Sequence, residues 1–471
     1  MRKFLLCIGI MLTTISTNAQ FTNLHNFSTV GSGGYSSLTS ANGLLYGTAN
    51  SGGANNTGYV YSLNTDGTGF TILYSFAGTE GRFPCGSLLY NNGVLYGMTS
   101  QGDGITTNGG TIYKLNIDGT GYSILHSFTN NNPVDGNNPQ GSLVISGNVM
   151  YGMTRKGGAV YADILGGEGT IFKINTDGSN FSLLHSFDFG EENPYGSLLL
   201  DGNFLYGMTA TYGSNNNAGK IFKINKDGTG YTILHTFNYT NGSKPNGTLV
   251  LGGNTLYGMT ALGGATGKGN VFKINTDGTG FQNLFSGLNG TTNYTWSYGS
   301  LVLVGNILYG KSNVNLYSIN TDGTGYQWYN WGQYGTAPES YDIQENGTLT
   351  YDGSALYGVN NRYGGTSDRG VIYKFIPANL SVDSNSLANK TIKIYPNPAT
   401  DRITIDCESQ ISVNGWNIKI INTLGQEVFS QRINQQQNTI QLNTVSGTGI
   451  YLVKIYDDSN KLIDTKKIIL K

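Results

Sequence analysis

The side chains of this chain that could carry out chemistry are few, and their spacing does not form a metal site. Its four histidines, His25, His126, His185 and His235, occupy the same position of a repeated strand-like segment. A zinc ion needs three or four ligands that converge at about 2 Å. Equivalent positions on separate repeat units cannot converge in this way. We therefore expect structural histidines, no bound metal and no cofactor.

Carboxylates and nucleophiles form no catalytic pattern either. The aspartates of the repeated region mostly stand alone in Asp-Gly turns, which are typical of tight hairpins, whereas a calcium loop needs several carboxylates. Glycoside hydrolysis needs two carboxyl groups about 5–10 Å apart, and the adjacent Glu191-Glu192 pair is better explained as solvated loop charge. The serines follow a repeated Gly-Ser-Leu pattern and not the Gly-x-Ser-x-Gly setting of a hydrolase. The sequence therefore indicates no catalytic residue.

The elements that would position any site come from an internal repeat. The tripeptide Leu/Met-Tyr-Gly occurs seven times, at intervals of 48 to 55 residues. Its tyrosines are Tyr46, Tyr96, Tyr151, Tyr206, Tyr257, Tyr309 and Tyr357. This period is typical of propeller blades, and glycine and proline interrupt the chain too often for long helices. Each unit holds four strand candidates joined by tight turns, which is the antiparallel blade pattern.

The two ends of the repeated region complement each other. Residues 21–27 have the pattern of a fourth strand without the other three, and the last unit stops after its third strand at 371–375. Pairing of these segments would complete seven units and remove the exposed edges of an open array. We therefore predict an all-β chain with a seven-bladed β-propeller over residues 20–376, closed by the N-terminal strand.

The flanking segments predict export and a second domain. Residues 1–19 combine a positive start, an apolar run at 4–15 and small residues before Gln20, as a signal peptide does. No later segment has the roughly 20 apolar residues of a membrane span, and a net charge of −1 argues against a nucleic-acid partner. Residues 377–390 have the composition of a linker. Residues 391–471 hold about seven short strands, which predicts a small Ig-like β-sandwich.

Four short motifs follow one another through the last 80 or so residues. They are Tyr395-Pro396-Asn397-Pro398, Thr423-Leu424-Gly425-Gln426, the segment 449–454, and the terminal segment with Lys466, Lys467 and Lys471. In this order the tail resembles the type IX secretion C-terminal sorting domain of Bacteroidota. The resemblance implies that the type IX secretion machinery carries the protein across the outer membrane. It also implies removal of the tail and either surface attachment or release.

The repeated region itself carries a second set of motifs. Leu-Tyr-Gly-Met-Thr recurs in several units, Leu-His-Ser-Phe occurs at 125–128 and 184–187, and Lys-Ile-Asn-Thr-Asp-Gly-Thr-Gly occupies 273–280. With these motifs, about residues 21–376 resemble the GloVer tandem repeats. That family is named after its repeat, and the resemblance implies no particular activity.

The loops supply the candidate binding residues. Strand direction reverses at each turn, so the short, uniform turns lie on one face of the disc and the long, variable loops lie on the other. Variable loops on a rigid scaffold are a common way to build a binding surface. The candidate ligand face comprises Arg155, Lys156, Tyr161, Asp163, Glu168, Tyr212, Trp296, Trp331, Arg362 and Tyr363.

Three functions remain open at this stage. The first is a secreted or surface-attached binding or adhesion module for an extracellular glycan or protein, with Trp296, Trp331 and Tyr363 stacking on sugar rings. The second is an extracellular polysaccharide-acting enzyme, a hydrolase or a lyase, with acids drawn from Asp163, Glu168 and Glu191. The third is a structural spacer on the cell surface. The sequence favours a protein that is not an enzyme.

Overall fold

The computed structural model of the chain consists of β-strands, turns and loops, with no α-helix in the regions that it describes. These regions are residues 19–27, 37–102, 109–128, 135–158, 168–188, 193–210, 218–287, 299–311, 315–330, 347–360, 370–377, 392–407, 413, 415–422, 427–442, 445, 449–456 and 462–470. The expected all-β class is confirmed. Two compact units are present, Gln20–Ile376 and a second that contains Pro377–Lys471. Within the described regions, no helix is long and apolar enough to cross a membrane.

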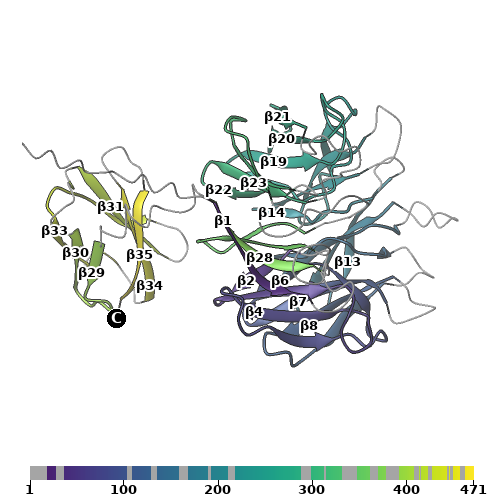
Figure 1. Cartoon of the computed structure of the whole chain (residues 1–471), viewed down its shortest axis with the longest axis horizontal. Coiled ribbons are helices and arrows are strands. Elements are labelled where there is room, and N and C mark those ends of the chain that lie inside the picture. Colours follow the sequence, from purple (N-terminus) through teal and green to yellow (C-terminus); the bar gives the residue numbers. More distant parts are fainter. Residues whose placement is uncertain are drawn as a thin grey trace, which may run out of the picture. The chain divides into compact units, whose positions relative to one another are not determined.

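The described residues of the unit Gln20–Ile376 form seven four-stranded antiparallel sheets (Figure 1). In six of them the four strands follow one another along the chain. Sheet 1 contains β2 (Thr39–Ala41), β3 (Leu44–Ala49), β4 (Tyr59–Asn64) and β5 (Thr71–Ser75). Sheet 2 contains β6 (Arg82–Asn91), β7 (Val94–Gln101), β8 (Thr111–Asn116) and β9 (Ser123–Ser127). Sheet 3 contains β10 (Val144–Ser146), β11 (Val149–Thr154), β12 (Thr170–Asn175) and β13 (Ser182–Ser186).

The next three sheets have the same order. Sheet 4 contains β14 (Leu199–Asp201), β15 (Phe204–Thr209), β16 (Lys220–Asn225) and β17 (Thr232–Thr236). Sheet 5 contains β18 (Val250–Gly252), β19 (Thr255–Thr260), β20 (Asn270–Asn275) and β21 (Gln282–Ser286). Sheet 6 contains β22 (Val302–Val304), β23 (Ile307–Lys311), β24 (Asn315–Asn320) and β25 (Gln327–Asn330).

Sheet 7 combines strands from the two ends of the unit. Its order is β1 (Gln20–Asn26), β28 (Val371–Ile376), β27 (Leu356–Asn360) and β26 (Thr350–Tyr351). β1 runs antiparallel to β28, with Gln20 opposite Ile376 and Asn26 opposite Val371 (Figure 1). Strands that are about 350 residues apart in the sequence are therefore hydrogen-bonded neighbours in one sheet.

The repeated Tyr-Gly pair reflects the way in which the two inner strands of a sheet pack. A Cβ atom on Gly207 of β15 would lie 2.3 Å from Cζ of Phe222 on β16, and a Cβ on Gly47 would lie 2.4 Å from the Tyr61 ring. An aromatic side chain lies over the glycine, and only glycine leaves room for that ring.

Stacked rings connect consecutive sheets at their outer strands. The ring centroids of His235 and Phe281 lie 3.7 Å apart, and those of His25 and Phe70 lie 3.8 Å apart, with nearly parallel planes in both pairs. His126 and His185 stack in the same way on aromatic rings of the next sheet. Each histidine therefore packs between sheets, which supports the structural role that its position predicts.

The Asp-Gly turns use their carboxylates locally. Oδ1 of Asp227 accepts hydrogen bonds from the backbone N–H of Thr229 at 2.9 Å and from its hydroxyl at 2.7 Å. The same pattern occurs at Asp66, Asp118, Asp177, Asp277 and Asp322. These aspartates stabilise their own turns, so the hairpin interpretation is confirmed.

The second unit is a pair of sheets around one core. The first sheet has the order β29 (Ile392–Tyr395), β30 (Arg402–Cys407) and β33 (Gln437–Gln441). The other has the order β32 (Glu427–Ile433), β31 (Trp416–Asn422), β34 (Gly449–Tyr456) and β35 (Leu462–Leu470). Buried side chains from both sheets, among them Ile405, Trp416 and Val453, form one hydrophobic cluster.

Candidate functional site

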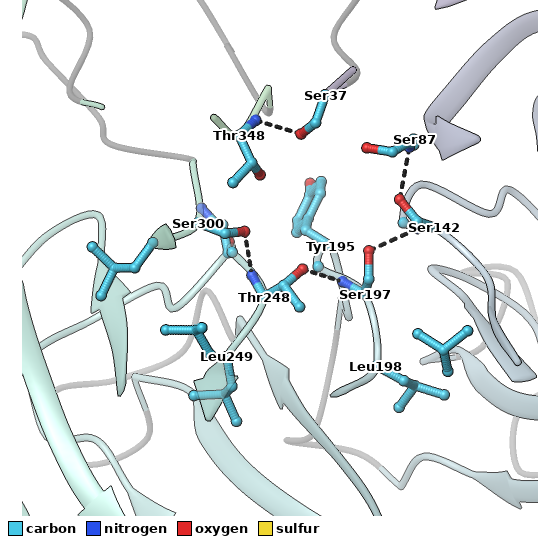
Figure 2. Close-up of a pocket in the computed structure, with 18 of the residues that line it drawn as sticks. Ser37, Ser87, Ser142, Tyr195, Ser197, Leu198, Thr248, Leu249, Ser300 and Thr348 are labelled. Atoms are coloured by element: carbon cyan, nitrogen blue, oxygen red, sulfur yellow. Dashed lines mark hydrogen bonds between the residues drawn. The ribbon is translucent and has the colours of Figure 1, made fainter. Parts of the chain in front are cut away.

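A cavity of about 330 Å³ is lined by residues from all seven sheets of the first unit. Its polar wall contains one hydroxyl side chain from each sheet, at or just before the first strand. These residues, which we name the hydroxyl ring, are Ser37, Ser87, Ser142, Ser197, Thr248, Ser300 and Thr348 (Figure 2). The first strand of each sheet is entered from the long-loop side, so the ring lies at the end of the sheets where the sequence predicted the ligand face.

Hydrogen bonds connect neighbouring members of the hydroxyl ring (Figure 2). The backbone N–H of Ser142 donates to Oγ of Ser197 at 2.7 Å, and that of Ser197 donates to Oγ1 of Thr248 at 3.0 Å. The same bond joins Ser87 to Ser142, Thr248 to Ser300, and Thr348 to Ser37. A short hydroxyl side chain at this position therefore satisfies a backbone donor of the adjacent sheet.

Six of the seven ring residues follow a glycine, and at several of these positions the glycine allows this close approach. A Cβ atom on Gly86 would lie 2.1 Å from the carbonyl oxygen of Gly141, and one on Gly196 would lie 2.1 Å from that of Gly247. The obstacle is backbone, which cannot turn aside as a flexible side chain can. Glycine is thus required at these contacts between neighbouring sheets.

Variable polar side chains line the cavity one residue before these glycines. They include Gln140, Tyr195 and Asn246. Asn246 is only 4% exposed, and neither its Nδ2 nor its Oδ1 has a hydrogen-bond partner in the described part of the chain. A buried amide without a partner costs about 1–3 kcal/mol. An unpaired buried amide on a cavity wall is the strongest local sign of a binding site.

The loops that carry these side chains share a backbone feature, a residue with positive φ directly before a proline. Phe83, Asn138, Asn193 and Lys244 have φ values between 54° and 58°, and each precedes a proline. Positive φ is uncommon outside glycine. The proline ring packs closely on a glycine before the third strand, because a Cβ on Gly219 would lie 2.4 Å from Pro245 Cδ. This packing fixes the segment that leads to the cavity wall.

Arg155 connects the candidate ligand face to the cavity. Its guanidinium carbon lies 4.4 Å from the centroid of the Tyr195 ring, and its Nε donates to Oδ1 of Asn193 at 3.1 Å. A cation over an aromatic face is attracted by the ring quadrupole. Arg155 therefore helps to hold Tyr195 in place.

The other predicted ligand-face residues are only partly described. Lys156 is exposed, and its backbone forms a bridge with Asn137, whose N–H donates to the Lys156 carbonyl at 2.8 Å. Glu168 is half-buried shortly before β12. Tyr161, Asp163, Tyr212, Trp296, Trp331, Arg362 and Tyr363 lie outside the described residues.

Sequence reasoning missed the hydroxyl ring, Tyr195 and Asn246. The available signal was a hydroxyl residue after glycine in six of the seven units, with a residue before the glycine that changes from unit to unit. We interpreted this pattern as a strand consensus, because a sequence does not show that the seven positions surround one cavity.

A smaller cavity of about 230 Å³ adjoins the first and shares Gly86 and Gln140 with it. Cys85 lines this smaller cavity, and its Sγ donates to the carbonyl oxygen of Pro139 at 3.0 Å. Burial raises the pKa of the Cys85 thiol, so the reactive thiolate is disfavoured. Across the described residues, no group of three or more His, Cys, Asp or Glu side chains could hold a metal ion.

In the second unit, the two ends of the sorting motif lie side by side. Oδ1 of Asn397 accepts a hydrogen bond from the backbone N–H of Ile469 at 2.9 Å. The N–H of Ala399 donates to the Ile469 carbonyl at 2.8 Å. The segment with Tyr395, Pro396 and Pro398 is thereby joined to β35, which contains Lys466 and Lys467, whereas Lys471 lies outside the described residues.

Comparison with protein families gives two matches. Residues 9–210 and 161–350 match the family model of the Gloeobacter/Verrucomicrobia repeat. Residues 393–471 match the secretion system C-terminal sorting domain. This sorting domain indicates handling by the type IX secretion system and a secreted or outer-membrane surface-attached protein.

Similarity to individual proteins is partial. An endo-acting ulvan lyase of Formosa agariphila is 30% identical over 106 residues, which cover 22% of this chain and 20% of the lyase. The ulvan lyase NLR42 of Nonlabens ulvanivorans is 31% identical over 90 residues, or 19% of this chain and 16% of that protein. The matches thus span about a fifth or less of these relatives. Among solved structures, PorZ, a surface component of the type IX secretion system of Porphyromonas gingivalis, has 15% identity and a TM-score of 0.47 over 94% of this chain and 60% of PorZ.

Proposed function

Because the chain belongs to the Gloeobacter/Verrucomicrobia repeat family and ends in a secretion-system sorting domain, we propose that it is an exported binding module. In this proposal the seven sheets are the blades of one closed propeller. The central cavity and the long-loop face bind an extracellular glycan or protein. The signal peptide at 1–19 starts export, and the sorting domain delivers the binding module to the cell surface or the medium.

Two contacts support ring closure. β1 supplies the outer strand of sheet 7 through its pairing with β28. Sheet 7 also meets sheet 1, because the N–H of Thr348 donates to Oγ of Ser37 at 2.6 Å, and the Thr350 hydroxyl donates to the Leu38 carbonyl. A closed ring leaves no long unpaired edge, which suits a protein that must remain folded outside the cell.

The observation that carries the binding proposal is the cavity lined by all seven sheets. Ligand sites are commonly concave, rigid and supplied with a few well-placed polar groups. The hydroxyl ring is fixed by backbone hydrogen bonds, and the Asn246 amide has no partner in the described regions. In a structural spacer that binds no ligand, nothing would offset the energetic cost of an unpaired buried amide.

A binding assay with the full chain tests this proposal. We expect the chain to bind at least one polysaccharide on an array that contains neutral and acidic glycans, including ulvan oligosaccharides. Ser197→Phe fills the cavity and should abolish binding, whereas Asp227→Ala, in a turn at the opposite end of sheet 4, should not. Equal binding by Ser197→Phe and the unmodified chain would exclude the cavity. Absence of binding on the array would favour a structural spacer.

An enzyme acting on polysaccharide is the second candidate, favoured by the short matches to two ulvan lyases. Its acids would come from Asp163, Glu168 and Glu191, of which only Glu168 is described. Incubation of the full chain with ulvan, followed by the ultraviolet absorbance of an unsaturated product, tests this alternative. Product formation that Glu168→Gln abolishes would favour the enzyme. A flat signal together with glycan binding would favour the binding module.

The export route has a separate test. Deletion of residues 391–471 should leave the protein in the periplasm, because the sorting domain would be missing. Normal surface delivery of the truncated chain, measured by cell fractionation, would contradict the role of these residues. Asn397→Ala is a milder variant that removes the side-chain acceptor for the Ile469 N–H, and it should lower surface delivery without a block in synthesis.

A further inference from the structure

We infer that the central cavity is a site for a single uncharged sugar residue, held by the Asn246 amide, the hydroxyl ring and the Tyr195 ring. This inference rests on the proposed binding function and adds the chemical class of the ligand. No charged side chain occurs among the described residues that line the cavity. An ionised group that enters it would lose its hydration without meeting an opposite charge.

The Asn246 amide matches the hydrogen-bonding pattern of adjacent sugar hydroxyls. Its Nδ2 is a donor and its Oδ1 an acceptor, and neither has a partner within the described part of the chain. A hydroxyl group can both donate and accept. In the complex, the amide turns towards the cavity, donates to one ligand oxygen and accepts from a neighbouring hydroxyl. Binding then satisfies a group that is unsatisfied in the free protein.

The hydroxyl ring supplies donors that are already oriented. The oxygens of Ser142, Ser197 and Thr248 accept backbone N–H groups, and Thr248 is joined in turn to Ser300. The hydroxyl groups of Ser142, Ser197 and Thr248 line the cavity, and each can also donate its proton to a ligand oxygen. Because the oxygens are fixed by the backbone, little side-chain entropy is lost when the ligand binds.

Tyr195 and the size of the cavity limit the ligand further. An aromatic ring held by Arg155 and placed at the cavity wall offers an apolar face for the C–H groups of a sugar (Figure 2). The volume of about 330 Å³ is at the lower end of the range of about 300–1,000 Å³ for small-molecule sites. One sugar ring, such as the end of a chain, fits this space better than an internal stretch of polymer.

The test uses the full chain and small sugars as probes. Methyl glycosides of glucose, galactose, mannose and xylose are compared with glucuronate and galacturonate by saturation-transfer NMR and calorimetry. We expect at least one neutral glycoside to bind and both uronates to bind more weakly. Asn246→Leu should lower the affinity about tenfold or more while leaving the melting temperature unchanged or higher, because it removes an unpaired buried polar group. Asn254→Leu, an exposed turn position of the same sheet, is the matched control.

The outcomes separate this inference from the proposed function. Tighter binding of a uronate, or unchanged affinity in Asn246→Leu, would overturn the inference. If Asn246→Leu does not fold, Tyr195→Ala serves as the test variant. It should lower the affinity for neutral glycosides at least as much. Binding of an array polysaccharide that no neutral glycoside competes with would refute the sugar class and leave the binding function standing. Failure of the full chain to bind any array glycan or monosaccharide would contradict both this inference and the proposed binding function.

Discussion

At the turn end of sheet 4, the carboxylate of Asp227 accepts two hydrogen bonds from Thr229. At the cavity end of sheet 5, the Asn246 amide accepts none and donates none within the described residues. The two positions belong to consecutive repeated units, and both carry short polar side chains. The turn residue is exposed and internally satisfied, whereas the cavity residue is buried and unsatisfied.

This difference shows how a repeat can build a scaffold and a site from similar residue types. At the turn end, the same hydrogen bonds recur with the same residues, so variation from sheet to sheet is small. At the cavity end, the hydroxyl ring and its glycines are nearly constant, and the residue before each glycine changes from Gln140 to Tyr195 to Asn246. A constant frame around variable polar groups is suited to recognition.

The largest expected effect comes from a glycine that allows adjacent sheets to meet at the cavity end. In Gly196→Ala the new Cβ would lie 2.1 Å from the Gly247 carbonyl oxygen. Because backbone must shift, we expect a loss of about 3 kcal/mol or more in the free energy of unfolding, measured by chemical denaturation.

The matched control is Gly202→Ala at the turn end of the same sheet. Gly202 has a φ of 56° and no atom within 4 Å of an added Cβ, so only backbone strain opposes alanine there. That strain should cost about 1 kcal/mol. Equal losses for the two variants would show that the cavity end is no more tightly constructed than the turn end.

An intermediate case lies at the outer strands, where His235 is partly buried against Phe281. Burial lowers the pKa of His235 from 6.5 to about 4. The unfolded chain therefore binds a proton in a pH range where the folded chain does not. The contribution of the neutral, partly buried His235 to the free energy of unfolding is therefore fully present above pH 6.5. This contribution is lost as the pH falls from 6.5 towards 4.

His235→Phe should weaken this pH dependence. Sheet 5 already uses phenylalanine at the equivalent position, where Phe285 stacks on Tyr326 with ring centroids 3.7 Å apart. We expect the melting temperature of the variant to fall less between pH 7 and pH 5 than that of the unmodified chain. An equal fall in both proteins would mean that His235 does not carry this dependence.

The repeat and the second unit were largely predictable, because both depend on local patterns. In the second unit, about seven short strands are expected over residues 391–471, and the described residues contain seven, β29 to β35. The alternation of buried and exposed side chains determines such strands within a few residues. In the repeat, the first strand of most sheets is only two or three residues long, shorter than its apolar run suggests, because the preceding residues line the cavity.

The candidate site was much less predictable. Arg155 was expected at the ligand face because loop length and charge are visible in a sequence, but its stacking on Tyr195 depends on two loops about 40 residues apart. Asn246 gave no signal, because one asparagine in a Pro-Asn-Gly segment is typical of an exposed turn. Its burial follows from the meeting of several sheets, which no single repeat contains.

A smaller effect is expected when one bond of the hydroxyl ring is removed. Ser197→Ala deprives the Ser142 N–H of its acceptor, and the loss of stability should be about 1 kcal/mol. Ser127→Ala, at an exposed position of β9, should be nearly neutral. If Ser197→Ala is also neutral in chemical denaturation, water replaces the hydroxyl, and the ring serves recognition more than stability.

The smallest effect is expected at the exposed turn end. Hydrogen bonds from the Thr229 backbone N–H and, next, from its hydroxyl lower the pKa of Asp227 below its ordinary value of 3.8. The carboxylate therefore stabilises the fold above that value, and the contribution disappears as the pH falls through the lowered pKa. Asp227→Ala should reduce the melting temperature slightly at neutral pH, with a difference from the unmodified chain that narrows below pH 3.8. Ligand binding should be unchanged, since this turn lies at the opposite end of the sheet from the cavity. A loss of binding without a loss of stability in this variant would place the ligand at the wrong end of the sheets for our proposal.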